Sequence, residues 1–146
     1  MKKIVGAASA AAAAVACIAV GTTGTASADP ELNGTYTLTV DETQATTTGF
    51  QMKNPEVETK QWVVTSCGAG CANVTVPDIP NGGGQLKLVN GRWEMSKDMT
   101  LMNCNPGQPD VTVTTSLDPV TLQGTEVNTN HCINNVITSP ATLTPA

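Results

Sequence analysis

The chain has one histidine, His131, so any acid–base or nucleophilic mechanism that uses an imidazole depends on that residue. Ser96, Ser116 and Asp110 can be combined with it on paper into a serine triad. None of the serines, however, lies in a sequence of the nucleophile-elbow type. His131 also directly precedes Cys132, which favours a surface position beside a disulfide. We therefore predict no catalytic residue around His131.

Acidic pairs are the second group of residues that could do chemistry, because two carboxylates can hydrolyse a glycosidic bond. Glu94 and Asp98 lie four residues apart near Trp93, and Asp41 and Glu42 are adjacent. Acidic side chains at the ends of strands are usually only solvated. A hydrolase is therefore a remote alternative.

The cysteines give the clearest chemical signal in this sequence. Cys17 falls in an apolar N-terminal segment, and the other four cysteines permit three disulfide pairings. We favour Cys67–Cys71, because the glycines between these residues can take the positive φ values of a tight reversal. The remaining pair, Cys104–Cys132, closes a longer loop worth about 3–4 kcal/mol.

A metal site is the alternative use of these four thiols, with His131 as a further ligand. Zinc sites usually have paired ligands two residues apart, and an oxidising compartment disfavours free thiolates. The run Gly82-Gly83-Gly84 lacks the lysine and the following helix of a phosphate-binding loop, so we assign it flexibility. We therefore predict neither a metal nor a cofactor.

The N-terminal segment indicates where this chemistry takes place. An apolar run over residues 4–20 follows two lysines, and Ala-Ser-Ala at 26–28 has the small side chains that signal peptidase accepts. We predict a cleaved signal peptide over residues 1–28 and a secreted, extracellular or cell-envelope protein. An uncleaved membrane anchor is one alternative, because the apolar run is near the lower limit for crossing a bilayer. Lipid attachment at Cys17 is another.

Charge excludes one class of partner. The formal net charge of the chain is −5, and without the two lysines of the predicted signal peptide the balance becomes more acidic still. Such a surface repels phosphate backbones and anionic lipid headgroups. We predict no nucleic-acid partner and no stable membrane insertion after cleavage.

Strands and turns account for the rest of the sequence. Residues 34–40 alternate strictly between apolar and threonine side chains, which is the period of a half-buried strand. Asn90-Gly91 is the clearest hairpin signal, because both residues tolerate a positive φ. No helix is expected, and further strands are predicted at 51–53, 60–66, 72–76, 85–89, 92–96, 99–102, 110–117 and 121–128.

About eight short strands joined by compact turns predict a disulfide-stapled all-β domain over residues 29–136. We favour a single antiparallel meander that forms a closed or partly open barrel, because closure removes exposed sheet edges. A two-sheet sandwich is the alternative. Residues 137–146 are rich in threonine and proline and are predicted to form a flexible tail.

Short motifs follow one another in a defined order along the chain. They are Gly34-Thr35-Tyr36-Thr37, Trp62-Val63-Val64 leading to Cys67 and Cys71, Gly91-Arg92-Trp93, Cys104, Asp118-Pro119-Val120-Thr121-Leu122-Gln123-Gly124-Thr125 and Cys132. This order resembles small secreted proteins of mycobacteria and related actinobacteria. Similar segments occur in the extracellular parts of some of their membrane proteins, including sensor kinases. The resemblance implies an exported β-domain and no particular activity.

One departure from that group concerns aromatic residues. Leu117 stands where the group often has an aromatic residue just before the Asp-Pro turn. This weakens the idea of a shared aromatic pocket.

Two functions from different classes follow from these observations. The first is a non-enzymatic binding module for an envelope lipid, glycan or protein, with Tyr36, Trp62 and Trp93 as candidate ligand-lining residues. The second is a secreted structural or antigenic protein without a ligand pocket. Tryptophans in a small β-domain more often belong to the core, so an enclosed apolar cavity favours the first function and a filled interior the second. We rank the binding module first by fold analogy.

Overall fold

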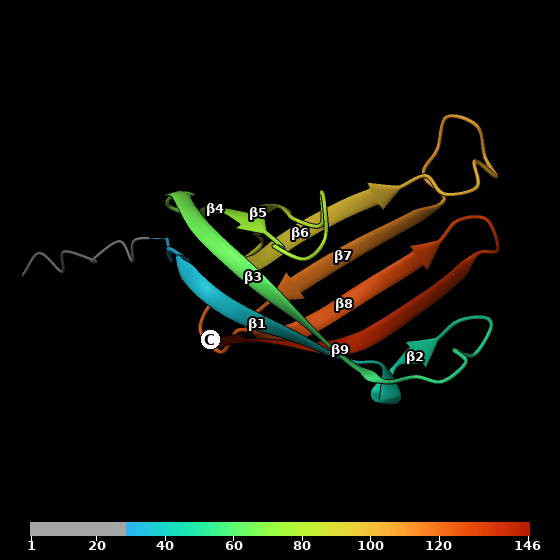
Figure 1. Ribbon diagram of the computed structural model, residues 1–146, viewed down its shortest axis with the longest axis horizontal. Helices are drawn as coiled ribbons and strands as arrows, with labels where there is room; N and C mark the ends of the chain where they lie inside the picture. Colours follow the sequence, from blue (N-terminus) through green and yellow to red (C-terminus); the bar gives the residue numbers. More distant parts are fainter. Residues whose placement is uncertain (1–28) are drawn as a thin grey trace, which may run out of the picture.

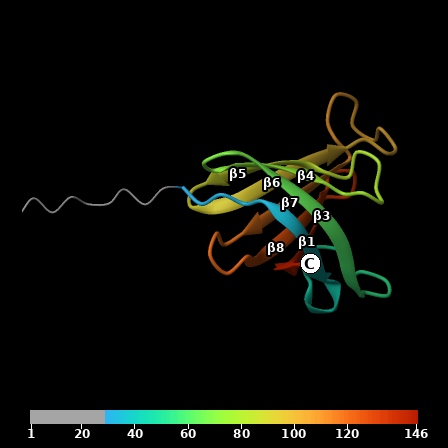
Figure 2. The same cartoon turned by 60° about the vertical axis from the view of Figure 1, so that its left-hand side comes forward.

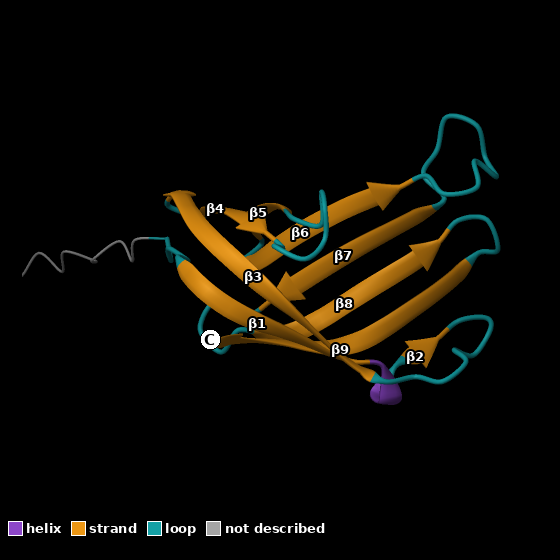
Figure 3. Cartoon of the chain, viewed as in Figure 1, coloured by secondary structure: helices purple, strands orange, loops and turns teal. Residues whose placement is uncertain are grey.

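The computed structural model describes residues 29–146, and its regular structure is almost entirely β (Figures 1 and 3). In this part of the chain the one helical element is a 3₁₀ turn, η1, drawn in purple in Figure 3. No helix among these residues is long and apolar enough to span a bilayer. The predicted signal peptide lies outside the described residues. In chain order the elements are β1 Gly34–Asp41, η1 Glu42–Gln44, β2 Thr46–Thr47, β3 Val57–Gly68, β4 Cys71–Thr75, β5 Gly84–Val89, β6 Arg92–Met99, β7 Val111–Leu117, β8 Gln123–Asn130 and β9 Asn135–Pro145.

All strands except β2 close into one antiparallel barrel. The order around the barrel is β1, β3, β4, β5, β6, β7, β8 and β9, and β9 pairs back with β1. Figures 1 and 2 both show β1 and β3 crossing over the long strands β6, β7 and β8. The short β2 pairs with β9 beyond the stretch that β1 covers. The structure confirms the predicted closed antiparallel barrel over the alternative sandwich.

Strand β9 shows that the predicted flexible tail at 137–146 is wrong. β9 lies between β8 and β1 and closes the barrel. Its inward residues Ser139, Ala141 and Leu143 are buried. Pro140, which lacks an N–H, falls between the residues that pair with β2 and those that pair with β1. The composition suggested disorder because threonine and proline are common in tails, yet threonine also suits the outward face of a strand.

The hydrophobic core fills the end of the barrel at which β1 begins and β9 ends, which we call the packed end. Trp62, Trp93 and Leu117 are almost completely buried there. Leu32, from the segment before β1, is also buried, and the partly buried Leu122 of the β7–β8 turn packs against the same cluster. The two tryptophans are the largest fully buried side chains of this core.

The predicted turns and disulfides are formed. Asn90 and Gly91 have φ values of 49° and 75° and join β5 to β6. Cys67 pairs with Cys71 and Cys104 pairs with Cys132, with Cα–Cα separations of 5.1 and 5.7 Å. The structure confirms the disulfide pairing that the sequence favoured.

Two of the predicted short strands are wrong. The predicted strand at 99–102 does not form, because β6 ends at Met99 and the amides of residues 101–104 bind the buried carboxylate of Asp110. Residues 51–53 form no strand, and the two-residue β2 lies earlier in the chain. Both errors lie in the connections between strands, where apolar residues do not face the barrel core.

Deleting residues 137–146 is expected to abolish cooperative unfolding, because the barrel loses the strand that joins β8 to β1. Circular dichroism during heating measures this loss. Deletion of Ala146 alone, which removes one backbone hydrogen bond to Thr35, is the control and is expected to retain the transition. An unchanged transition in the longer deletion would contradict the assigned role of β9.

Removing the two disulfides separately is expected to have unequal effects. In the chain-entropy account the replacement of Cys104 and Cys132 by alanine costs about 3–4 kcal/mol, and that of Cys67 and Cys71 about 2 kcal/mol. Urea unfolding of the two double variants measures the difference. Equal losses, or a larger loss for the Cys67–Cys71 variant, would contradict the prediction.

Candidate functional site

The interior of the barrel changes from apolar to charged along its strands. Inward positions on β3 run from Trp62 to Lys60 and Glu58, because successive side chains of a strand face opposite sides. On β6 the same alternation runs from Met95 to Lys97. We call this less filled half of the barrel the open end. The same alternation is visible in the sequence, where it places these lysines on the strand face that carries the tryptophans.

An ion pair crosses the barrel interior next to the core. Lys60 Nζ lies 3.0 Å from Glu58 Oε2 and 3.8 Å from Glu126 Oε1. Because β3 and β8 are not neighbours in the sheet, the contact with Glu126 spans the lumen. The hydroxyl of Thr115 donates a further hydrogen bond of 3.3 Å to Glu126 Oε2. Both lumenal oxygens of Glu126 therefore have partners.

The charge state of Lys60 reflects these contacts. Burial alone lowers the pKa of Lys60, but the attraction of Glu126 and the hydrogen bond to Glu58 outweigh it, so the pKa lies above its ordinary value. Lys60 is thus a firmly protonated group at the boundary between the core and the open end.

A cavity of about 170 Å³ adjoins this ion pair. Its lining is mostly apolar, with Trp62, Met95 and Val113 among the apolar side chains. The polar groups at its wall include Lys60, Lys97 and Glu126. An apolar hollow with a few charged groups at one side can hold an apolar group and orient a polar one.

The β4–β5 loop, residues 76–83, forms part of the cavity wall through Val76, Ile79 and Gly82. Backbone hydrogen bonds from Ile79 N to Val76 O (3.1 Å) and from Gly82 N to Ile79 O (2.8 Å) hold the loop. A Cβ on Gly82 would lie 2.7 Å from Ile79 Cβ, and one on Gly83 would overlap the carbonyl oxygen of Val74. Two of the three glycines predicted to give flexibility therefore permit close packing, and Gly84 belongs to β5.

The three predicted ligand-lining residues lie in different places. Trp62 lines the cavity. Trp93 is fully buried in the core, and its Nε1 has no hydrogen-bond partner among the described residues. Tyr36 is partly buried against the core, and its hydroxyl donates a 3.3 Å hydrogen bond to the carbonyl of Asn33. Strand alternation alone does not show which inward aromatic residue faces the core and which a cavity.

His131 takes part in a short hydrogen-bonded chain. Thr112 Oγ1 donates to Asp98 Oδ1 at 2.7 Å and lies 3.0 Å from His131 Nε2. Because the hydroxyl has one proton and gives it to the carboxylate, Nε2 must donate to Thr112 Oγ1. In this arrangement His131 cannot serve as a base toward Thr112.

Of the other residues of the notional triad, Asp110 lies next to His131, whose backbone amide donates a 2.8 Å hydrogen bond to the carbonyl of Asp110, but the carboxylate of Asp110 accepts from loop amides and not from the imidazole. The two serines have other partners. Ser116 Oγ accepts a 2.8 Å hydrogen bond from Arg92 Nε, and Ser96 Oγ lies 3.0 Å from Thr114 Oγ1. Glu94 and Asp98 lie on the outward face of β6. Asp41 caps η1, where its carboxylate accepts from the amide of Thr43. These groups do not converge on one cleft.

Asp110 organises the β6–β7 loop, residues 100–110, around a buried carboxylate. Its Oδ2 accepts hydrogen bonds from the amides of Leu101, Met102 and Asn103 at 2.6–2.8 Å, and its Oδ1 from Cys104 N at 2.9 Å. The bond from Met102 and the other amide bonds outweigh burial, so the pKa of Asp110 lies below its ordinary value. No sequence pattern predicts this role, because the four amides precede Asp110 by six to nine residues in an irregular segment.

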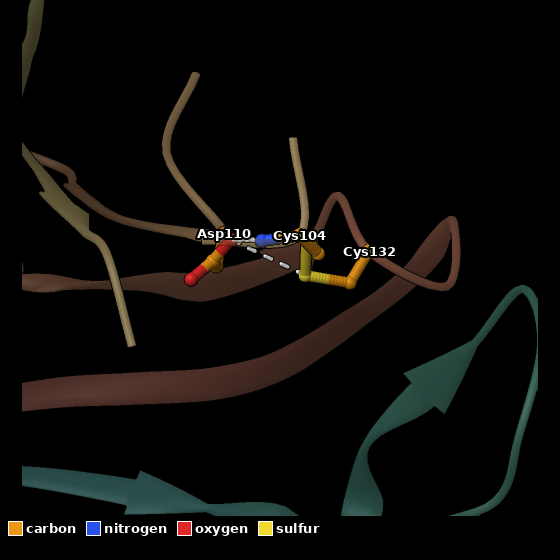
Figure 4. Close-up of side chains that lie close together, drawn as sticks. All are labelled: Cys104, Asp110 and Cys132. Atoms are coloured by element: carbon orange, nitrogen blue, oxygen red, sulfur yellow. Dashed lines mark hydrogen bonds between the residues drawn. A yellow bond between two sulfur atoms is a disulfide. The ribbon is translucent and has the colours of Figure 1, made fainter. Parts of the chain in front are cut away.

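Cys104 and Cys132 lie beside the same carboxylate, as Figure 4 shows. The ligand atoms of these three residues are within 4.8 Å of one another. The two sulfurs, however, form a disulfide and offer no thiolate to a metal. Disulfide sulfurs carry no hydrogen, so their distances of 2.9 and 3.4 Å from Asp110 Oδ1 are close contacts and not hydrogen bonds. The cluster is therefore a structural brace in its oxidised form.

No family model matches this chain, and no curated protein is similar to it. Among solved structures, the chain is similar to the monomer form of the sensor domain of PknI from M. tuberculosis. The match has a TM-score of 0.58 and 20% sequence identity, and covers 80% of this chain and 88% of the other. The two chains share a fold. The match also comes from a mycobacterial domain, in line with the resemblance that the motif order indicates.

Replacing Asp110 by asparagine is expected to lower the urea midpoint at pH 7, because four amides lose a charged acceptor. Since the pKa of the folded carboxylate is depressed, its contribution exists above the ordinary aspartate pKa and is lost as pH falls through the lower folded value. The difference between wild type and D110N should therefore shrink below about pH 4. The variant D78N, at an exposed position of the β4–β5 loop, is the control. A pH-independent difference would contradict this account.

Proposed function

We propose that this protein is an extracellular, non-enzymatic binding module whose barrel takes a small apolar molecule or group into the cavity beside Trp62. The cavity carries this proposal, because it is mostly apolar and lies next to fixed charges. A barrel that served only as a rigid or antigenic body would need no such hollow, and unfilled apolar space costs stability. The cavity therefore favours binding over the structural alternative.

The size of the cavity limits what it can hold. Apolar cavities of about 150 Å³ can bind a molecule such as benzene, whereas pockets for drug-sized ligands usually span about 300–1,000 Å³. The volume of about 170 Å³ therefore suits one ring or a short alkyl chain. Met95 and Met99 at its wall are flexible side chains that adapt to different shapes.

The chemistry of the lining discriminates among the candidate ligands. A glycan would bring hydroxyl groups against a mostly apolar wall, and burying them without partners is unfavourable. A large lipid exceeds the volume, although one short apolar end of it would fit. We therefore place a small apolar or amphipathic molecule ahead of a glycan or a protein.

The comparison and the disulfides support an extracellular sensing role. The similar solved structure is described as a sensor domain, and a sensor must bind a ligand or a partner. The two disulfides belong to an oxidising compartment. A hydrolase remains the remote alternative, because His131 lies away from the cavity and contacts Asp98 only through Thr112.

Filling the cavity tests this function. Benzene is expected to shift the backbone amide signals of Trp62, Met95 and Thr115 in NMR titrations of the wild type. V113W places a large ring in the cavity and is expected to weaken benzene binding at least about tenfold, since the ligand and the ring cannot share the space. T114W, at the adjacent outward-facing position of β7, should bind like the wild type. Circular dichroism confirms that both variants fold.

Two results would overturn the proposal. If benzene leaves all amide signals of the wild type unchanged, the cavity is not accessible to small apolar molecules. Equal binding by V113W and T114W would show that benzene binds elsewhere.

A further inference from the structure

Among the described charged residues of the cavity wall, Lys97 alone takes no part in the ion pair. It lies on β6 between Met95 and Met99 at an inward position and is half-buried. Its cross-strand neighbour on β7 is Val113, another residue of the cavity wall. The strand alternation thus directs the side chain of Lys97 toward the mostly apolar cavity that it helps to line.

Within residues 29–146 the ammonium of Lys97 has no partner. No carboxylate lies within 4.0 Å of it, and no side-chain hydrogen bond involves it. The adjacent Asp98 faces outward and accepts from Thr112. Lys60, by contrast, contacts both Glu58 and Glu126. Of the two lysines at the cavity, Lys60 is therefore paired with carboxylates, whereas Lys97 can pair with an anionic group of a ligand.

The carboxylates near the cavity are already engaged. Glu58 and Glu126 share Lys60, and Glu126 also accepts from Thr115. A ligand amine would have to compete with Lys60 for them and would enter against the positive charge of Lys97. A ligand carboxylate would meet an ammonium without a partner, and a charge that leaves water needs such a partner.

Building on the proposed function, we propose that the cavity selects small monocarboxylates. The apolar part of the ligand, a short alkyl chain or a single ring, lies against Trp62 and Met95, and its carboxylate pairs with the ammonium of Lys97. The limited volume selects against long acyl chains, and the unpartnered lysine selects against amines. Lys97 is thus a specificity-determining residue, and the apolar wall supplies affinity that carboxylates and neutral analogues share.

Three probes with the same alkyl chain test this assignment: hexanoate, 1-hexanol and hexylamine, each titrated into the purified protein and followed by NMR. Hexanoate is expected to bind about fivefold or more tightly than 1-hexanol, and hexylamine more weakly than either. K97M keeps an apolar stem of similar length and is expected to remove the advantage of hexanoate over 1-hexanol. The control K87M changes a lysine on the outward face of β5 and should behave like the wild type.

The outcomes separate this inference from the proposed function. If 1-hexanol and hexanoate bind equally and K97M changes neither, the carboxylate selectivity is wrong while the binding cavity stands. If hexylamine binds most tightly, the selectivity is reversed, and the glutamates rather than Lys97 recognise the ligand. If none of the three probes binds although benzene does, the selectivity is wrong and the binding cavity stands, whereas failure of benzene as well overturns both.

Discussion

The lumen of a closed eight-stranded barrel has a nearly fixed width, and side chains must fill it. This chain has four aromatic residues for the purpose, and one of them, Phe50, is 70% exposed. Trp62 and Trp93 fill the packed end, where Leu32 and Leu122 close it. Beyond Met95 the interior holds smaller or charged side chains, and the cavity lies there. The hollow is thus the consequence of a barrel of ordinary width and a sequence with few large residues.

Charges inside a barrel are costly unless they are paired, and their arrangement here is uneven. Lys60 reaches across the lumen to Glu126 and along its own strand to Glu58. This contact joins strands that share no backbone hydrogen bonds, so it connects separate parts of the barrel wall across the lumen. Lys97 has no such partner in the described part of the chain. The same polar layer therefore bounds the core, with one of its two lysines paired to carboxylates and the other not.

Loops at the open end depend on a charge and a covalent bond in place of a hydrophobic core. Leu101 and Met102 are more than 70% exposed, so apolar packing does not hold the β6–β7 loop. The carboxylate of Asp110 gathers its amides, and the disulfide ties it to the β8–β9 turn through Cys132. Both interactions lie outside the barrel interior. Their arrangement leaves the lumen free for the cavity.

The sequence by itself determined the features that depend on neighbouring residues. Strict alternation predicted β1, the Asn90-Gly91 turn predicted the hairpin of β5 and β6, and only three pairings of four cysteines had to be compared. Tertiary structure decided the rest: that a threonine- and proline-rich segment is the closing strand β9, that Glu126 meets Lys60, and that four amides bind Asp110. Barrel closure brings together residues that are far apart in the chain, and no local pattern encodes which strands face each other across the lumen.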